Sequence, residues 1–270
     1  MTRTILLTLA YDGTRYSGWQ SQPGRSTVQG TLAGAIRSVS GETVQPRGSS
    51  RTDAGVHALG QMVSFESGAA HDAATWVRAL NARLPPDITV VEGADVAPGF
   101  DPVRGAVSKV YRYRIHDAPW RPVLARHLVW RWKSRLDLPS MCHAAGTLVG
   151  EHDFTSFETT PSTRLSKVRT IHRLDVSRRR GGDDLDGAEI WVEVEGNGFL
   201  HNMVRIIVGS LVMVGCGRRR PEWMAEVVAA RHRPLAGPTA PPQGLVLVSI
   251  VVDPGKAVTP PRDTALPPTP

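Results

Sequence analysis

The longest apolar stretch of the chain, Phe199–Cys216, constrains the fold more than any other segment. It contains His201, Asn202 and Arg205, whereas a membrane span needs about 20 mainly apolar residues without such a charge. We therefore expect a helix at Phe199–Val214 that is buried in the core of the protein. The N-terminus runs straight into strand-like sequence and carries no apolar signal segment. The sequence thus predicts a soluble, cytoplasmic protein with no membrane partner.

One side of this predicted helix is polar. Asn202, Arg205 and Gly209 recur at i, i+3 and i+7 and form a stripe beside the apolar face. A charged arginine in so apolar a helix needs an anion, because an unpaired buried charge is costly. A carboxylate such as Asp53, an RNA phosphate or a purely structural ion pair would each meet that need.

Two series of strands and helices follow one another along the chain. The first begins with the β-like residues 4–11, and the second restarts with strict alternation at 109–116, after a Pro- and Gly-rich stretch at 97–105. The other predicted elements are helices at 27–39, 72–84, 138–149 and 221–230, and strands at 61–66, 88–93, 168–177, 189–195 and 245–252. Strands and helices in this irregular order indicate an α+β fold, with antiparallel sheet packed under helices.

The same pattern predicts the domain organisation. A chain of 270 residues allows one large domain or two modest ones. We predict an N-terminal α/β lobe at 1–103 and a C-terminal α/β lobe at 104–252. Residues 253–270 are rich in proline and lack apolar periodicity, so we predict a disordered tail there.

The chain is basic, with 32 Lys+Arg against 25 Asp+Glu and a formal charge of +7. All but four of the basic residues are arginines, which bind phosphate bidentately and stack on bases. Basic residues gather at 104–135 and 164–180, and acidic residues at 183–195. Such blocks favour an electrostatic footprint for a nucleic acid, although a GC-rich genome also produces arginine-rich chains.

Common cofactor motifs are missing from the sequence. It contains no G-x-x-x-x-G-K-[ST], G-x-G-x-x-G, H-E-x-x-H or G-x-S-x-G segment. Its two cysteines, Cys142 and Cys216, do not form a C-x-x-C pair. This cysteine content is typical neither of a zinc ribbon nor of a disulfide framework. We expect a reaction that uses no cofactor and no metal.

A loop of small residues at 48–60 frames one carboxylate, Asp53. Arg51 lies two positions before it, and a nearby arginine favours the ionised form that a nucleophile or base requires. Gly55 allows a ligand or another backbone to approach closely. Taken alone, this segment is more typical of an Asp-x-Gly turn on the surface than of a catalytic loop.

Tyrosines and arginines alternate along the predicted strand at 110–116. Arg112 and Arg114 share one face, and Tyr111 and Tyr113 share the other. An aromatic ring beside arginines is a common platform for an extruded base. The alternative is that both tyrosines belong to the core, and we prefer it for Tyr113.

With these segments in place, the chain resembles the tRNA pseudouridine synthase A family over about residues 4–252. The motifs that carry the resemblance are Tyr11-Asp12-Gly13 through Gly18-Trp19-Gln20, Ser50–Ala58, Tyr111-Arg112-Tyr113, Gly150–Phe154, Gly196–Leu200, Met203-Val204-Arg205 and Thr239–Pro242. Ser50 departs from the glycine that many members carry before Arg-Thr-Asp. The proline-rich tail has no counterpart in the family.

The resemblance implies two ferredoxin-like, RNA-binding-like α/β lobes with mostly antiparallel sheets around a central basic cleft, in a homodimer. It implies isomerisation of uridine to pseudouridine at tRNA positions 38, 39 and 40, in the anticodon stem-loop, on a flipped-out base. In this reaction the N1 glycosidic bond breaks and C5 bonds to the same ribose carbon. The alternatives are a silent RNA-binding protein on the same scaffold and a pseudouridine synthase for another RNA.

The resemblance also implies roles for five residues of this chain. Asp53 is the catalytic aspartate, whether it attacks ribose C1′, attacks uracil C6 or promotes a glycal intermediate. Tyr111 stacks on the target base and serves in proton transfer at C5. Arg205 pairs with Asp53, Arg51 takes the space or the phosphate contacts of the extruded nucleotide, and Leu245 lines the pocket.

Overall fold

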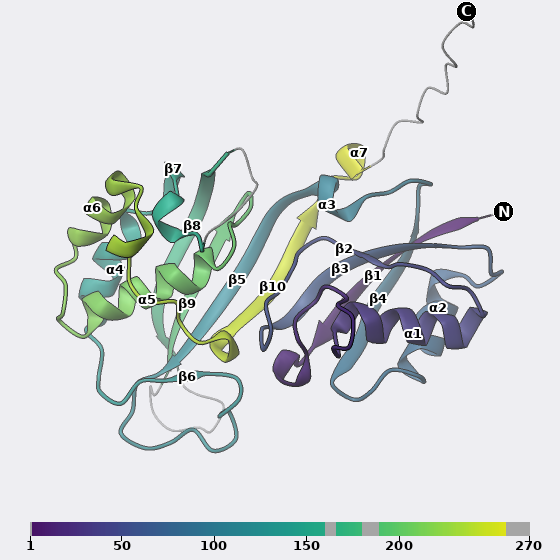
Figure 1. The fold of residues 1–270 in the computed structure, drawn as a ribbon, viewed down its shortest axis with the longest axis horizontal. Helices are drawn as coiled ribbons and strands as arrows, with labels where there is room; N and C mark the ends of the chain where they lie inside the picture. The colour runs from purple at the N-terminus through teal and green to yellow at the C-terminus, as the bar shows by residue number, and fades with distance from the viewer. Residues whose placement is uncertain (1, 160–165, 180–188, 258–270) are drawn as a thin grey trace, which may run out of the picture.

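The computed structural model of the chain describes residues 2–159, 166–179 and 189–257 (Figure 1). Its strands are β1 Arg3–Tyr11, β2 Arg47–Gly48, β3 His57–Ser67, β4 Ile88–Val96, β5 Ala106–His116, β6 Trp130–Arg131, β7 Gly150–Asp153, β8 Val168–Arg179, β9 Glu189–Gly196 and β10 Leu245–Val252. Its α-helices are α1 Val28–Ser40, α2 Ala73–Asn81, α3 Pro102–Gly105, α4 Leu138–Gly146, α5 Met203–Gly215, α6 Trp223–Ala230 and α7 Pro254–Ala257. The predicted α+β class is confirmed.

The described strands form one continuous sheet. Its main path runs β4-β1-β3-β10-β5-β9-β8-β7, with β2 on β3 and β6 on β5. Pairing is antiparallel except between β10 and β3 and between β5 and β6. β10 lies in the middle, where it joins β3 of the first half to β5 of the second half. Two lobes divided at residues 103 and 104 remain a prediction, because the sheet runs through that boundary.

Two groups of helices flank the central strands. Figure 1 shows α1 and α2 grouped near β1, β3 and β4, and α4, α5 and α6 grouped near β8 and β9, while β5 and β10 run between the groups. Thr27 caps α1 by accepting a hydrogen bond from the Gly30 amide, and Gly41 ends the helix at φ 76°. Asp72 caps α2 in the same way through the amide of Thr75.

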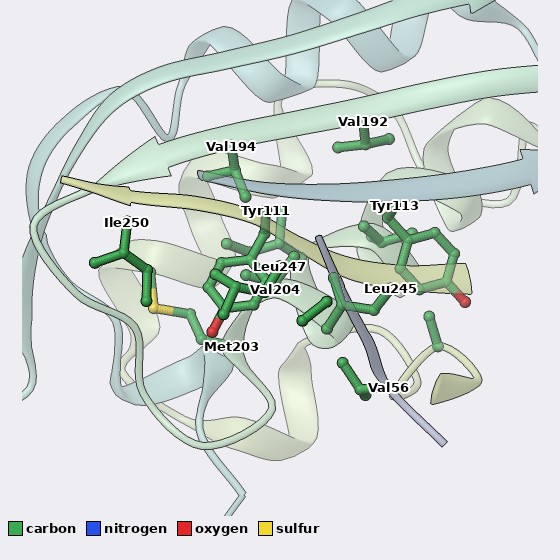
Figure 2. Close-up of a cluster of buried hydrophobic side chains, with 14 of the residues drawn as sticks. Val56, Tyr111, Tyr113, Val192, Val194, Met203, Val204, Leu245, Leu247 and Ile250 are labelled. Atoms are coloured by element: carbon green, nitrogen blue, oxygen red, sulfur yellow. The ribbon is translucent and has the colours of Figure 1, made fainter. Parts of the chain in front are cut away.

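The predicted apolar helix is the centre of the second half. Nearly every side chain of α5 is buried, as its composition predicts. The helix begins at Met203 rather than at Phe199. Asn202 has a left-handed backbone conformation, and a right-handed α-helix cannot run through such a residue. Figure 2 shows Met203 and Val204 of α5 packed near Tyr111 of β5 and Leu247 of β10. The hydrophobic core therefore packs directly against the strand and the helix that carry the predicted site residues Tyr111 and Arg205.

The predicted tail is described only at its start. Pro254–Ala257 form the short helix α7. The rest of the predicted tail, 258–270, lies outside the described residues, as do Arg164, Arg180 and the acidic residues 183–186.

Candidate active site

All five residues predicted for the site line one cleft of about 1750 Å³. The cleft lies between the loop at 49–54, strand β5 and the start of α5. Asp53 and Arg51 come from the loop, Tyr111 from β5, Arg205 from α5 and Leu245 from the start of β10. Segments that are distant in sequence therefore meet where the sequence predicted a site.

The loop that carries Asp53 is held by the N-terminal segment. The Trp19 amide donates to the Thr52 carbonyl at 3.0 Å, and the Tyr11 hydroxyl bonds the Thr52 hydroxyl at 2.8 Å. Gly18 must lack a side chain, because a Cβ there would lie 2.7 Å from the Thr52 carbonyl oxygen. Gly55 completes the turn at φ 77°. Asp53 is thus presented by a fixed backbone, and its side chain is 31% exposed to the cleft.

Arg205 forms the ion pair with Asp53 that the sequence predicts. Its Nη1 lies 3.0 Å from Asp53 Oδ2, and its side chain is only 15% exposed. Its Nε donates to the Ala240 carbonyl at 2.8 Å. Gly209 allows residues 238–240 to lie close enough to α5 for the bond between Arg205 and Ala240. A Cβ at position 209 would lie 1.8 Å from the Pro238 carbonyl oxygen and would push these residues away from the helix. The polar stripe of α5 therefore serves the site.

Tyr111 is buried beneath the cleft. Its ring meets Phe199 edge-on, with centroids 5.2 Å apart, and its hydroxyl lies 2.8 Å from the Ser50 hydroxyl. Burial raises the pKa of Tyr111 to about 12. The hydrogen bond with Ser50 lowers this pKa, but by less than burial raises it. Its phenol is therefore protonated at neutral pH. Tyr113 is fully buried and belongs to the core, as we preferred from the sequence.

These tyrosines predict how stability depends on alkaline pH. Burial raises the pKa of Tyr11, Tyr111 and Tyr113 above the usual value of about 10. Tyrosines of the unfolded chain ionise first, so the contribution of these tyrosines to the free energy of unfolding is fully present below about pH 10 and falls as the pH rises towards 12. We expect phenolate absorbance to appear together with the loss of circular dichroism. Three phenolates titrating near pH 10 in the folded protein would contradict these burials.

Arg51 and Leu245 differ in exposure. Arg51 is exposed at the cleft and forms no ion pair with any residue in the described part of the chain. Leu245 is 6% exposed, and Figure 2 shows it between Tyr113 and Val56. Arg51 is thus available to an anion, whereas Leu245 forms part of the apolar wall.

Sequence reasoning missed three contacts of the site. His201 Nε2 lies 3.5 Å from Asp53 Oδ1, Phe199 packs on Tyr111, and Ser50 bonds the Tyr111 hydroxyl. The sequence places His201 and Phe199 in what was predicted to be the first turn of the helix. These two residues reach the site only because residues 199–202 form a non-helical turn in place of the predicted first turn of the helix.

The cleft is basic, but only part of the charge that the sequence concentrates lies there. The basic residues that line it are Arg25, Arg47, Arg51, Lys109, Arg169 and Arg205, and the acidic ones are Asp53, Asp101 and Glu158. Arg112 and Arg114 do not face the cleft. Alternation along β5 places them opposite Tyr111 and Tyr113, where they pair with Glu193 at 3.1 Å and Glu189 at 2.8 Å. The basic surface predicted around β5 is therefore corrected: Arg112 and Arg114 do not belong to the cleft.

Within the described ranges, no group of three or more His, Cys, Asp or Glu side chains is arranged to hold a metal ion. Among the same residues, no helix is both long and apolar enough to cross a membrane.

A basic cleft with one ion-paired, accessible carboxylate and a buried aromatic beside it suits an enzyme that acts on an extended anionic substrate. Comparison with known proteins agrees with this class. A family model described as tRNA pseudouridine synthase matches residues 8–100 and 144–251. The tRNA pseudouridine synthase A of Geobacter sulfurreducens is 43% identical over 248 residues, covering 92% of this chain and 99% of that protein. That of Myxococcus xanthus is 42% identical over 260 residues and covers 96% of each.

The chain belongs to the tRNA pseudouridine synthase family and is an isomerase that acts on tRNA. Among solved structures, a chain of "Structure of H/ACA RNP bound to a substrate RNA containing 2'-deoxyuridine" aligns with a TM-score of 0.35 and 11% identity. That alignment covers 77% of this chain and 44% of the other, a similarity too distant to support a function.

Proposed function

We propose that this enzyme converts uridine to pseudouridine at positions 38, 39 and 40 of the tRNA anticodon stem-loop, with Asp53 as its catalytic residue and the target base flipped into the cleft. The observation that carries the proposal is the accessible Asp53 carboxylate, paired with Arg205 at the base of a basic cleft. A base in a stem must leave its stack to reach such a carboxylate, which costs a few kcal/mol. The arginines and Lys109 around the cleft attract the phosphates that flank the extruded nucleotide.

Each residue has a proposed part in this reaction. Asp53 acts on the flipped nucleoside in its ionised form, which all three routes require: attack on ribose C1′, attack on uracil C6 or formation of a glycal. Arg205 keeps that carboxylate in place. The N1–C1′ bond breaks, the uracil turns, C5 bonds to C1′, and the proton lost from C5 is balanced by one gained at N1.

The other residues hold the nucleotide. Tyr111 supplies an aromatic surface for the base, and its neutral phenol, bonded to Ser50, takes part in proton transfer at C5. Arg51 is exposed at the cleft and binds a phosphate or fills the space that the base leaves. Leu245 excludes water from the pocket wall, which strengthens the electrostatic contacts inside.

The test is to incubate the protein with unmodified tRNA transcripts and to map pseudouridine by carbodiimide adducts and primer extension. The proposal predicts stops at positions 38–40, and none when those uridines are replaced by cytidine. Stops confined to other positions or to other RNAs would overturn the site assignment. Tight binding with no stops would identify a silent RNA-binding protein instead.

We also propose that the enzyme is a cytoplasmic homodimer. In support, the loop after β5 exposes two apolar side chains, Val123 at 66% and Leu124 at 77%, to solvent. Sedimentation velocity tests this proposal. We expect the mass of two chains, and a smaller sedimentation coefficient for Leu124→Glu. A monomer at all protein concentrations would overturn it.

A further inference from the structure

Asn202 has a backbone conformation that needs an explanation. Among the described residues, only it and Arg231 adopt a positive φ without being glycine, and Asn202 has φ 62° and ψ 6°. Asparagine tolerates this region better than most residues, but the conformation is still strained and persists where the surroundings impose it. The residue immediately precedes α5, one turn before Arg205.

Its position would normally be used to cap the helix. An asparagine at the N-cap usually has an extended backbone and accepts a hydrogen bond from an amide of the first turn. Asn202 forms no such side-chain bond. The helix therefore forgoes a favourable cap, and the amide group of Asn202 is turned elsewhere.

That amide is bonded to Arg205. Asn202 Oδ1 accepts from Arg205 Nη1 at 2.7 Å, and its Nδ2 donates to the Thr159 hydroxyl at 2.7 Å. Because a guanidinium only donates, the amide oxygen must be the atom that faces Arg205. Thr159 is itself fixed, since its amide donates to the His201 carbonyl at 3.2 Å.

The geometry of the guanidinium shows what this contact does. Nη1 carries two hydrogens, and its two acceptors are Asn202 Oδ1 and Asp53 Oδ2. Nε is occupied by the Ala240 carbonyl. Two neutral oxygens thus fix the guanidinium plane without neutralising its charge, and the remaining Nη1 hydrogen points at Asp53.

We propose that Asn202 is a positioning residue of the active site, which holds Arg205 in the orientation that pairs it with Asp53. The left-handed turn and the missing helix cap are the structural cost of directing the amide oxygen at Arg205. This inference rests on the proposed roles of Asp53 and Arg205. It adds that the orientation of Arg205, and not its charge alone, is needed for turnover.

Two substitutions at the same position separate this role from a structural one. Asn202→Gly and Asn202→Ala both remove the amide, but only glycine relieves the strain of the left-handed backbone. We expect kcat for tRNA to fall about 10- to 100-fold in both variants, as for a misplaced catalytic group, with little change in KM. The Tm of Asn202→Gly will exceed that of Asn202→Ala. A kcat that follows Tm, or that stays unchanged in both variants, would overturn the proposal.

The dependence on Arg205 is tested by measuring single-turnover rates in an Arg205→Lys background. If Asn202 acts through the guanidinium, Asn202→Gly slows the wild type but adds almost nothing to Arg205→Lys. Multiplicative effects would show that Asn202 acts by another route. If Asp53→Asn leaves the enzyme active, the proposed function itself fails. If that variant is inactive while Asn202→Gly is fully active, only the present inference fails.

Discussion

We expect Asp53→Asn to lower the rate of pseudouridine formation by about 10³-fold or more, because the substitution removes the proposed catalytic carboxylate. The amide has nearly the shape of the carboxylate and still accepts the hydrogen bond from Arg205, but it carries no charge and cannot attack the nucleoside. The loop is held by Tyr11 and Trp19 through Thr52, so we expect the variant to keep the fold. tRNA affinity remains close to that of the wild type, because the basic side chains of the cleft are retained.

Two measurements check this result: the rate of pseudouridine formation, and the affinity for tRNA from fluorescence anisotropy. Asp72→Asn is a matched control, since it makes the same change at the N-cap of α2, where asparagine caps as well as aspartate does. We expect that control to be fully active. Normal turnover by Asp53→Asn would remove Asp53 from the mechanism.

We expect Arg205→Met to lower both stability and activity. Methionine replaces the apolar stem of the side chain, but it leaves Asp53 Oδ2, Asn202 Oδ1 and the Ala240 carbonyl without their donor. Unsatisfied buried acceptors cost about 1–3 kcal/mol, which corresponds to a fall in Tm of roughly 2–12 °C for a chain of this size. Loss of the group that orients Asp53 lowers kcat by about 10²- to 10³-fold.

Thermal unfolding and single-turnover kinetics check this second result. Arg220→Met is the control, because Arg220 pairs with Glu226 in an exposed ion pair that contributes little to stability. If Arg205→Met changes neither Tm nor rate, the ion pair with Asp53 has no function. A change in Tm alone would make it a structural ion pair, the alternative that the sequence left open.

Local sequence patterns predicted most of the elements, whereas the family resemblance supplied the set of candidate site residues, whose roles stay a prediction. Alternation along β5 correctly separated Tyr111 and Tyr113 from Arg112 and Arg114, because side chains of a strand point to opposite faces. It did not reveal which face borders the cleft. The arginines instead pair with glutamates of β9, a partner strand about 80 residues away in sequence.

The start of α5 is where the sequence misled. The predicted helix ran back to Phe199 through His201 and Asn202, although asparagine is a residue that often stands at the start of a helix. In the turn, the side-chain amide of Asn202 is bonded to both Thr159 and Arg205, and neither contact is visible in a linear pattern. The same turn brings His201 to Asp53 and Phe199 to Tyr111.

By itself, the sequence determined that one apolar helix carries an arginine that must meet an anion, because a buried charge cannot remain unpaired. It also determined which carboxylate was framed by small residues, Asp53. Only the tertiary structure decided that these two residues meet, that they do so in a basic cleft, and that an asparagine orients the arginine. Those facts depend on β10 joining the two halves of the sheet and on Gly209 admitting residues 238–240 to α5. Contacts between distant segments are set by packing, which local periodicity does not encode.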